Sequence, residues 1–131
     1  MAVSFPAGST VVSGTTSLTL TWPTNAVGDL ALLTVVNKAS TVTPATPTGW
    51  TLLVTGTGGT GTLGAGTGPV RVTIFQRVLT AVQSGTFTVT LTSGDVAMGG
   101  INLFRSDVVG ATWAVTSHDP SGTGRTCRPS R

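Results

Sequence analysis

The sequence predicts an all-β protein, a β-sandwich or jelly-roll-like domain of about eight short strands. Residues that favour helices are rare, since the chain has no Glu and a single Lys, whereas Thr and Val are abundant. Apolar and polar residues alternate with a period of two in several runs. Clusters of Gly, Pro, Ser and Asn separate these runs, as they do in turns between strands.

Three runs show the alternation most clearly, and we expect each to be a half-buried strand with its polar side outward. In residues 17–22, two leucines and a tryptophan share one face, and in residues 86–92 Phe, Val and Leu alternate with threonines. In residues 70–77 the two faces are mixed: Val70, Val72, Ile74 and, as a further candidate, Gln76 lie on one side, and Arg71, Thr73, Phe75 and Arg77 lie opposite. The expectation places the Val and Ile side of this strand in the core.

Two other runs are apolar without alternation. Residues 29–36 fit a strand that is covered on both faces, and residues 96–104 are similar, with the Gly99-Gly100 pair marking a bulge or close packing. Periodicity alone also allows a short helix in either run, but the strand-rich context favours strands. Shorter strands are expected at residues 3–5, 11–12, 50–55 and 112–115.

Two segments depart from this pattern. Residues 56–68 contain almost only Gly and Thr and predict a long flexible loop, and residues 117–131 predict an extended basic arm after a sandwich domain at 1–116. Segments of this composition seldom order by themselves, so we expect neighbouring chains to hold both. The candidate partner contacts are Gly56, Gly58, Gly61, Gly64, Gly66 and Gly68 in the loop and Arg125, Arg128 and Arg131 in the arm.

The charge pattern indicates association with protein rather than with nucleic acid. The formal net charge is +3 and charged residues make up 8% of the chain, so little repulsion keeps copies apart. The body of the chain has scattered basic residues, no basic stripe with interleaved aromatics and no Tyr, and we expect no nucleic-acid partner. No signal peptide and no apolar run near the ~20 residues of a membrane span are evident, which predicts synthesis in a reducing cytoplasm without export and no membrane partner.

Sequence motifs for catalysis, cofactor binding or metal binding are weak. We therefore predict that the protein is not an enzyme and binds no cofactor or metal. Gly56, Gly58 and Gly61 match the spacing of a dinucleotide fingerprint, but more Gly and Thr and then Pro69 follow, so no helix can begin there. The chain has a single cysteine, Cys127, which excludes an intrachain disulfide. Cys127 and the single histidine, His118, are interpreted as solvated residues of the arm.

Two alternatives remain open. Asp29, Asp95 and Asp107 are explained by turn and capping roles, although a pair among the four Asp could still form the carboxylate cleft of a hydrolase. Three tryptophans, at positions 22, 50 and 113, are expected in the core, but exposed tryptophans would form a sugar-stacking platform.

The order of segments resembles a family of virion structural proteins of tailed bacteriophages, chiefly those that infect actinobacteria. The likeness rests on an opening Met-Ala-Val, on a Gly-Asp-Leu run at 28–30, on Gly-Trp-Thr at 49–51, on an apolar strand at 72–78 and on a Gly-rich strand at 98–108. The resemblance implies a homo-oligomer, a trimer or another ring, located on the virion.

Within that family, the resemblance implies an outer capsid decoration protein that acts by adhesion, with the major capsid protein or other virion proteins as partners. The alternative is a minor tail or fibre protein that binds a glycan.

Overall fold

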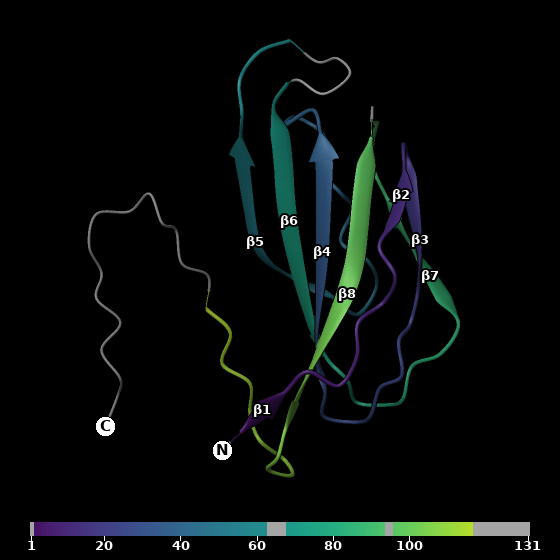
Figure 1. Ribbon diagram of the computed structural model, residues 1–131, viewed down its shortest axis with the longest axis vertical. Helices are drawn as coiled ribbons and strands as arrows, with labels where there is room; N and C mark the ends of the chain where they lie inside the picture. The colour runs from purple at the N-terminus through teal and green to yellow at the C-terminus, as the bar shows by residue number, and fades with distance from the viewer. Residues whose placement is uncertain (1, 63–67, 94–95, 117–131) are drawn as a thin grey trace, which may run out of the picture.

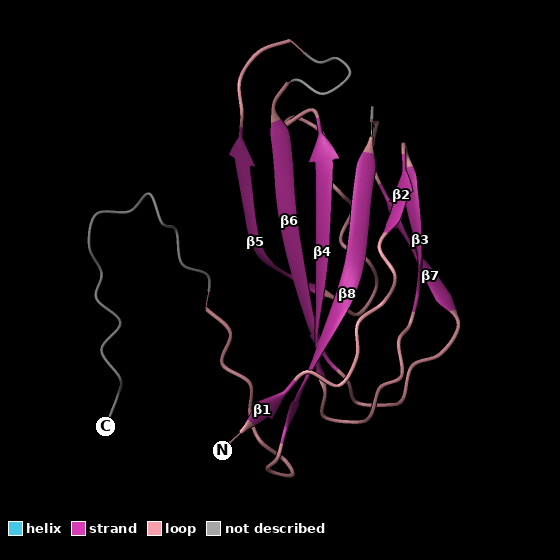
Figure 2. Cartoon of the chain, in the orientation of Figure 1, coloured by secondary structure: helices cyan, strands magenta, loops and turns pink. Residues whose placement is uncertain are grey.

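Eight antiparallel strands form two sheets that pack face to face, as Figure 1 shows. The structure is a computed structural model that describes residues 2–62, 68–93 and 96–116. The strands are β1 (Val3–Ser4), β2 (Val12–Gly14), β3 (Ser17–Thr21), β4 (Leu30–Lys38), β5 (Thr51–Gly58), β6 (Val70–Val78), β7 (Thr86–Thr90) and β8 (Ala97–Ser106). The prediction of an all-β, sandwich-like fold of about eight strands is therefore confirmed, and only strands and loops occur in the described part (Figure 2).

The large sheet has the strand order β1-β8-β4-β6-β5, with β2 added beside β8, and the small sheet consists of β3 and β7. Strand β4 lies in the middle and pairs along its whole length with β6 and along most of it with β8. The β2–β3 turn links the two sheets, since β2 pairs with β8 and β3 pairs with β7. No helix of the described residues is long and apolar enough to cross a membrane.

The core lies between the sheets and is built by strict alternation. In β4 and β8 the odd-numbered residues point inward, so Leu33, Val35 and Ile101 meet Leu18 and Leu20 of β3. Because cross-strand partners point to the same face of a sheet, the pairing of Leu33 with Phe75 also turns the odd positions of β6 inward. The loop between β4 and β5 and the residue after β6 add further buried side chains to the core, namely Val42, Trp50 and Leu79.

Strand β6 therefore shows the face opposite to the one that the sequence favours. Thr73 and Phe75 are buried, whereas Val72 is 38% exposed and Ile74 is only half-buried. The expectation that the Val and Ile side forms the core was wrong, because the register with β4 outweighs the strand's own pattern. Arg71 is accommodated at its strand end by hydrogen bonds to the Ser40 carbonyl and the Thr55 hydroxyl.

Three further expectations need correction. The run that contains β4 is covered on its inner face alone; the outer side chains from position 32 to position 38 are half-buried and no described strand lies over them. Residues 112–115 form no strand. Strand β5 continues to Gly58, so Gly56 and Gly58 belong to a strand edge rather than to the expected loop.

The Gly99-Gly100 pair marks close packing, and the β4–β8 register runs through it without a bulge. A Cβ added at Gly99 would lie 3.0 Å from the Thr34 carbonyl oxygen and 3.0 Å from Leu18 Cδ1, whereas one at Gly100 would meet ordinary contacts at 3.6 Å. The first glycine thus lets the small sheet approach β8.

We expect Gly99→Ala to lower the free energy of unfolding by about 1–3 kcal/mol, because the added methyl group must displace backbone or Leu18. Gly100→Ala is the matched control and should change the stability by less than about 0.5 kcal/mol. Urea denaturation of both variants checks this. Equal stabilities would show that the inner face of β8 is not tightly packed.

Candidate functional site

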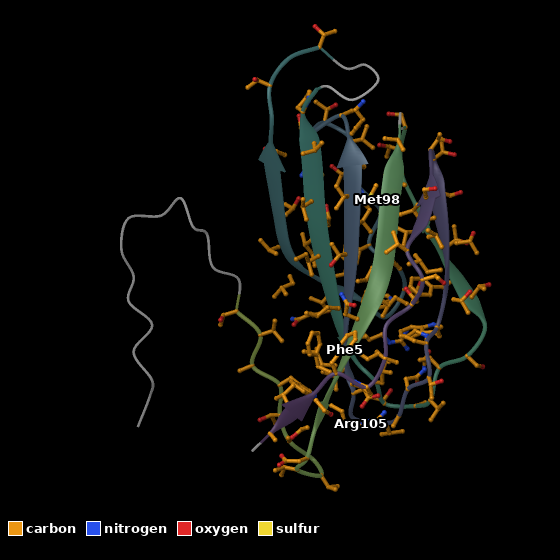
Figure 3. The ribbon with its side chains drawn as sticks, in the orientation of Figure 1. Phe5, Met98 and Arg105 are labelled. Carbon is orange, nitrogen blue, oxygen red and sulfur yellow. The ribbon has the colours of Figure 1, made fainter. Side chains whose placement is uncertain are left out.

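The outer face of the large sheet is the most distinctive surface of the protein. It carries the even-numbered side chains of β4, β6 and β8, which cross-strand pairing arranges in rows. One row joins Val72, Val36 and Met98, and the next joins Ile74 and Thr34 to Gly100. Val72 is 38% and Met98 48% exposed, and Figure 3 labels Met98 on this side of β8. Among the described residues, no strand or helix covers these rows.

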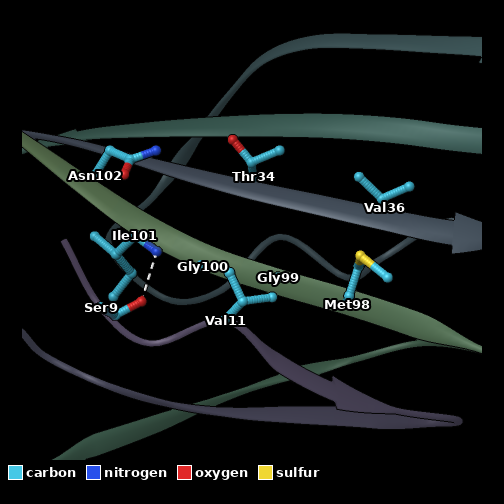
Figure 4. A pocket seen from close by; sticks show the side chains of 9 residues that line it. All are labelled: Ser9, Val11, Thr34, Val36, Met98, Gly99, Gly100, Ile101 and Asn102. Carbon is cyan, nitrogen blue, oxygen red and sulfur yellow. Dashed lines mark hydrogen bonds between the residues drawn. The ribbon is translucent and has the colours of Figure 1, made fainter.

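A shallow hollow of about 250 Å³ lies on this face between β4 and the chain segment before β2 (Figure 4). Val11, Val36 and Met98 form its apolar walls, and Gly100 leaves room because it has no side chain. The segment is fixed in place by Ser9, whose amide donates to the Ile101 carbonyl at 2.9 Å and whose hydroxyl accepts from the Ile101 amide at 2.8 Å. One wall of the hollow is therefore a segment that is hydrogen-bonded to β8.

The outer face is almost without charge. Lys38, at the end of β4, is the one charged residue among the outward positions of β4, β6 and β8. The neighbouring edge strand β5 contains no charged residue and no proline, although a bulge between Leu52 and Val54 interrupts its pairing. Charges and prolines are the common devices that keep sheet edges from pairing with other chains, so β5 is little protected. These surfaces offer apolar side chains and a sheet edge, and Lys38 is the only titratable side chain among the outward positions of β4, β6 and β8.

An ion pair between a buried carboxylate and a partly exposed guanidinium joins β8 to the residue before β4 at one end of the large sheet. Arg105 of β8 donates from Nε to Asp29 Oδ1 and from Nη2 to Asp29 Oδ2, both at 2.7 Å. The Ala26 amide donates to Asp29 Oδ2 at 2.8 Å, which is the expected turn role of this residue. The hydrogen bonds from Arg105, aided by that from Ala26 and by the charge of Arg105, hold the pKa of the Asp29 carboxyl below its usual range against the opposing effect of burial. Asp29 is 0% exposed, so it is a structural carboxylate and is not accessible to a substrate.

Of the residues that the sequence offers for catalysis or metal binding, the structure describes only Asp29 and Asp107, which hydrogen-bond different groups. Of the four Asp, Asp107 accepts a hydrogen bond from the Ala2 amide, and Asp95 and Asp119 lie outside the described residues. His118 and Cys127 also lie outside them. Within the described ranges, no three His, Cys, Asp or Glu side chains are close enough to hold a metal ion.

Two of the candidate partner contacts adjoin the outer face, because Gly56 pairs with Val72 and Gly58 pairs with Val70. Gly56 and Gly58 are in β5, Gly61 follows in the loop, and Gly68 precedes β6. The remaining candidates lie outside the described residues, namely Gly64, Gly66, Arg125, Arg128 and Arg131.

The tryptophans divide into two groups. Trp22 and Trp50 stack with ring centroids 5.5 Å apart, and Phe87 packs against both. Trp50 is 7% exposed and belongs to the core, as expected, and Trp22 packs partly buried beside it. Trp113 is not part of the core cluster, so the expectation of a core position was wrong for this residue. It donates from Nε1 to the Gly28 carbonyl at 2.9 Å, and the three tryptophans form no common platform.

Sequence reasoning missed both the apolar outer face and the ion pair. The signal for the face was present, since residues 29–36 lack alternation and the even side of 70–78 is aliphatic. We interpreted this signal as burial within one chain. No signal in one sequence pairs Asp29 with Arg105, which are 76 residues apart.

Comparison of the chain with protein-family models, with curated proteins and with solved structures finds no match.

We expect Arg105→Ala to be more destabilising than Asp29→Asn. The first change leaves the buried Asp29 carboxylate without its counter-charge, and because Arg105 is 42% exposed and solvent screens the pair, we expect a loss of about 1–3 kcal/mol. The second leaves Arg105, whose side chain is 42% exposed and reaches solvent, so the cost should be smaller. Thermal unfolding of the two variants at neutral pH measures the difference. The reverse order would contradict a dominant role for burial of Asp29.

The same pair predicts a dependence of stability on pH. Because the pKa of Asp29 is lowered in the folded state, its contribution is fully present above the unfolded value of about 3.9 and is lost as the pH falls through the folded value. The stability difference between the parent protein and Asp29→Asn should therefore be constant near neutral pH and shrink below about pH 4. Urea denaturation across this range tests it; a difference that stays constant at low pH would argue against the ion pair.

Proposed function

We propose that this chain is a structural protein of a bacteriophage virion, an outer capsid decoration protein that acts by adhesion and not by catalysis. The observation that carries the proposal is the uncovered, aliphatic outer face of the large sheet. A solvated sheet face normally carries polar residues, so an apolar one is typical of a surface that another molecule covers.

We propose a second copy of this chain as the molecule that covers this face. Identical faces repel each other when they carry many like charges, and here only Lys38, at one end of β4, is charged. Four strands about 4.8 Å apart, each with about eight residues rising 3.3 Å, span roughly 500 Å² in projection. A standard interface buries about 800 Å² of accessible surface on each partner, so the face and its rim have the size that a stable contact requires.

The resemblance to phage virion proteins supports the same interpretation. The segments that carry it become β4, β6 and β8, the three strands whose even-numbered residues form the outer face, and β5 at the sheet edge. The Asp29–Arg105 ion pair joins the Gly-Asp-Leu segment to the Gly-rich segment. These segments thus build one surface together, as an assembly role requires. The basic arm at 117–131 remains a candidate contact with the major capsid protein.

We expect the double variant Val72→Glu/Met98→Glu to lose self-association while it keeps its fold. Carboxylates in the middle of the apolar rows would repel an identical face but remain solvated in a monomer. Thr19→Glu/Thr88→Glu, on the exposed outer face of the small sheet, is the matched control and should associate like the parent. Analytical ultracentrifugation and circular dichroism measure both properties. An equally strong association of both variants would overturn the assignment of the interface.

The location on the particle is tested by counting copies. In a decoration protein, quantitative mass spectrometry of purified virions should give a copy number comparable to that of the major capsid protein or a fixed fraction of it. A few copies per particle would favour the alternative, a minor tail or fibre protein. Absence from virions would overturn the proposal in both forms.

A further inference from the structure

A second hollow, of about 330 Å³, lies at the end of the sandwich where the aromatic cluster meets the loop before β5. Trp22, Trp50 and Phe87 form one wall, and Arg77 lies beside them. Its other lining residues are mostly small and polar, namely Pro47, Thr48, Gln83, Ser84, Thr86 and Thr88. The hollow thus combines an aromatic wall, one cation and several hydroxyl groups. Because its chemistry differs from that of the apolar outer face, we expect it to bind a different kind of ligand.

The aromatic wall is rigid. The Trp22 and Trp50 rings lie 13° from parallel, and Phe87 is tilted against them with centroid distances of 5.3 and 5.7 Å. Trp50 is almost fully buried, and Trp22 and Phe87 are half-buried, so the last two present part of their rings to the hollow. Such a wall offers apolar contact to the C–H groups of a ligand at a low cost in side-chain entropy.

Arg77 is held in place but its charge is not neutralised. Its Cζ lies 5.7 Å from the centroid of the Trp22 ring, and Gly49 packs close behind, since a Cβ there would be 3.2 Å from Cζ. The other arginines of the large sheet donate to protein oxygens, Arg71 to a carbonyl and a hydroxyl and Arg105 to Asp29. The guanidinium of Arg77 donates no hydrogen bond and forms no ion pair within the described ranges. Its planar donors therefore remain available for a carboxylate.

Strand β7 adds backbone groups to the same hollow. The Thr90 carbonyl points away from β3 and accepts from the Ala45 amide at 2.8 Å. Backbone groups of alternate residues in a strand point to the same side, so those of Thr86 and Thr88 point to the same free edge. Among the described strands this edge of β7 has no partner, because β7 pairs only with β3, and Pro47 and Thr48 line the same hollow. Their amides and carbonyls can therefore bind hydroxyl groups.

From these contacts we infer that this hollow binds a saccharide unit that carries a carboxylate, with the carboxylate on Arg77, the ring against Trp22 and Phe87, and the hydroxyls on the β7 edge. Its volume is at the lower end of ligand sites, which span about 300–1,000 Å³, and suits one or two sugar rings rather than a folded partner. A single guanidinium, with no second cation among the lining residues, favours a singly charged carboxylate over a phosphate. This inference goes beyond the proposed adhesion function and does not depend on it.

Titration of the full chain with sodium D-glucuronate, followed by tryptophan fluorescence and by calorimetry, tests the inference. D-glucose and sodium acetate are the comparison ligands, because each carries half of the recognised chemistry. We expect saturable binding of glucuronate, weaker binding of glucose, and no effect of acetate on the fluorescence at the same concentrations.

Two variants at one position identify the role of the cation. Arg77→Gln should weaken glucuronate binding about tenfold or more, since it removes a charge-assisted bidentate contact. Arg77→Lys should bind with intermediate affinity, because it keeps the charge without the planar donors. The matched control is Arg71→Gln, which removes the same charge from the opposite end of β6 and should bind glucuronate like the parent once its fold is confirmed by circular dichroism.

Three outcomes would overturn the inference. The first is no saturable glucuronate binding. The second is acetate that binds as well as glucuronate, which would show a simple anion site. The third is equal affinity of the parent and Arg77→Gln. None of these outcomes would affect the sedimentation of the outer-face variants, so the saccharide site and the adhesion function can fail separately.

Discussion

The register of β4 with its two neighbours decides the rest of the structure. Strand β4 pairs with β6 from Leu30 to Lys38 and with β8 from Leu30 to Asn37, so three strands must present the same alternation. Because the side-chain period of a strand is two, a slip by one residue would turn every side chain of a strand to the other face. The inward positions of β8 carry Ile101 and Leu103 with small residues at 97 and 99, and this set packs against β3. β6 follows the same register, and its valines remain outside.

The consequence is a sheet with two apolar faces, of which the described residues cover only the inner one. The small sheet has two strands and occupies the inner face, while the outer face has no counterpart among the described residues. Burial of apolar area is the main favourable term in association, and it contributes only when a partner removes that area from water. The proposed contact with an identical copy would supply such a partner, and the near absence of charge on the outer face is compatible with it.

The two ends of β6 show how a strand with arginines on its inner side can still belong to a core. Arg71 and Arg77 lie at the strand ends, where their long side chains reach past the core. Arg71 binds protein oxygens, whereas Arg77 lies over Trp22 beside a polar hollow. The protein thus has two surfaces of different chemistry, a broad apolar sheet face and a small hollow with an aromatic wall and one cation. We proposed assembly for the first and a saccharide ligand for the second.

The sequence by itself determined the all-β class, the approximate strands and the close packing at the glycine pair, because alternation, residue propensities and turn residues act over short distances. It did not determine which side of residues 70–78 faces the core, since that strand's own pattern favours Val72 and Ile74. Only the tertiary structure decided this, through hydrogen-bonded register with strands distant in sequence. The Asp29–Arg105 pair and the placing of Arg77 over Trp22 depend on the same long-range pairing, because contacts between distant segments leave no periodic pattern in the chain.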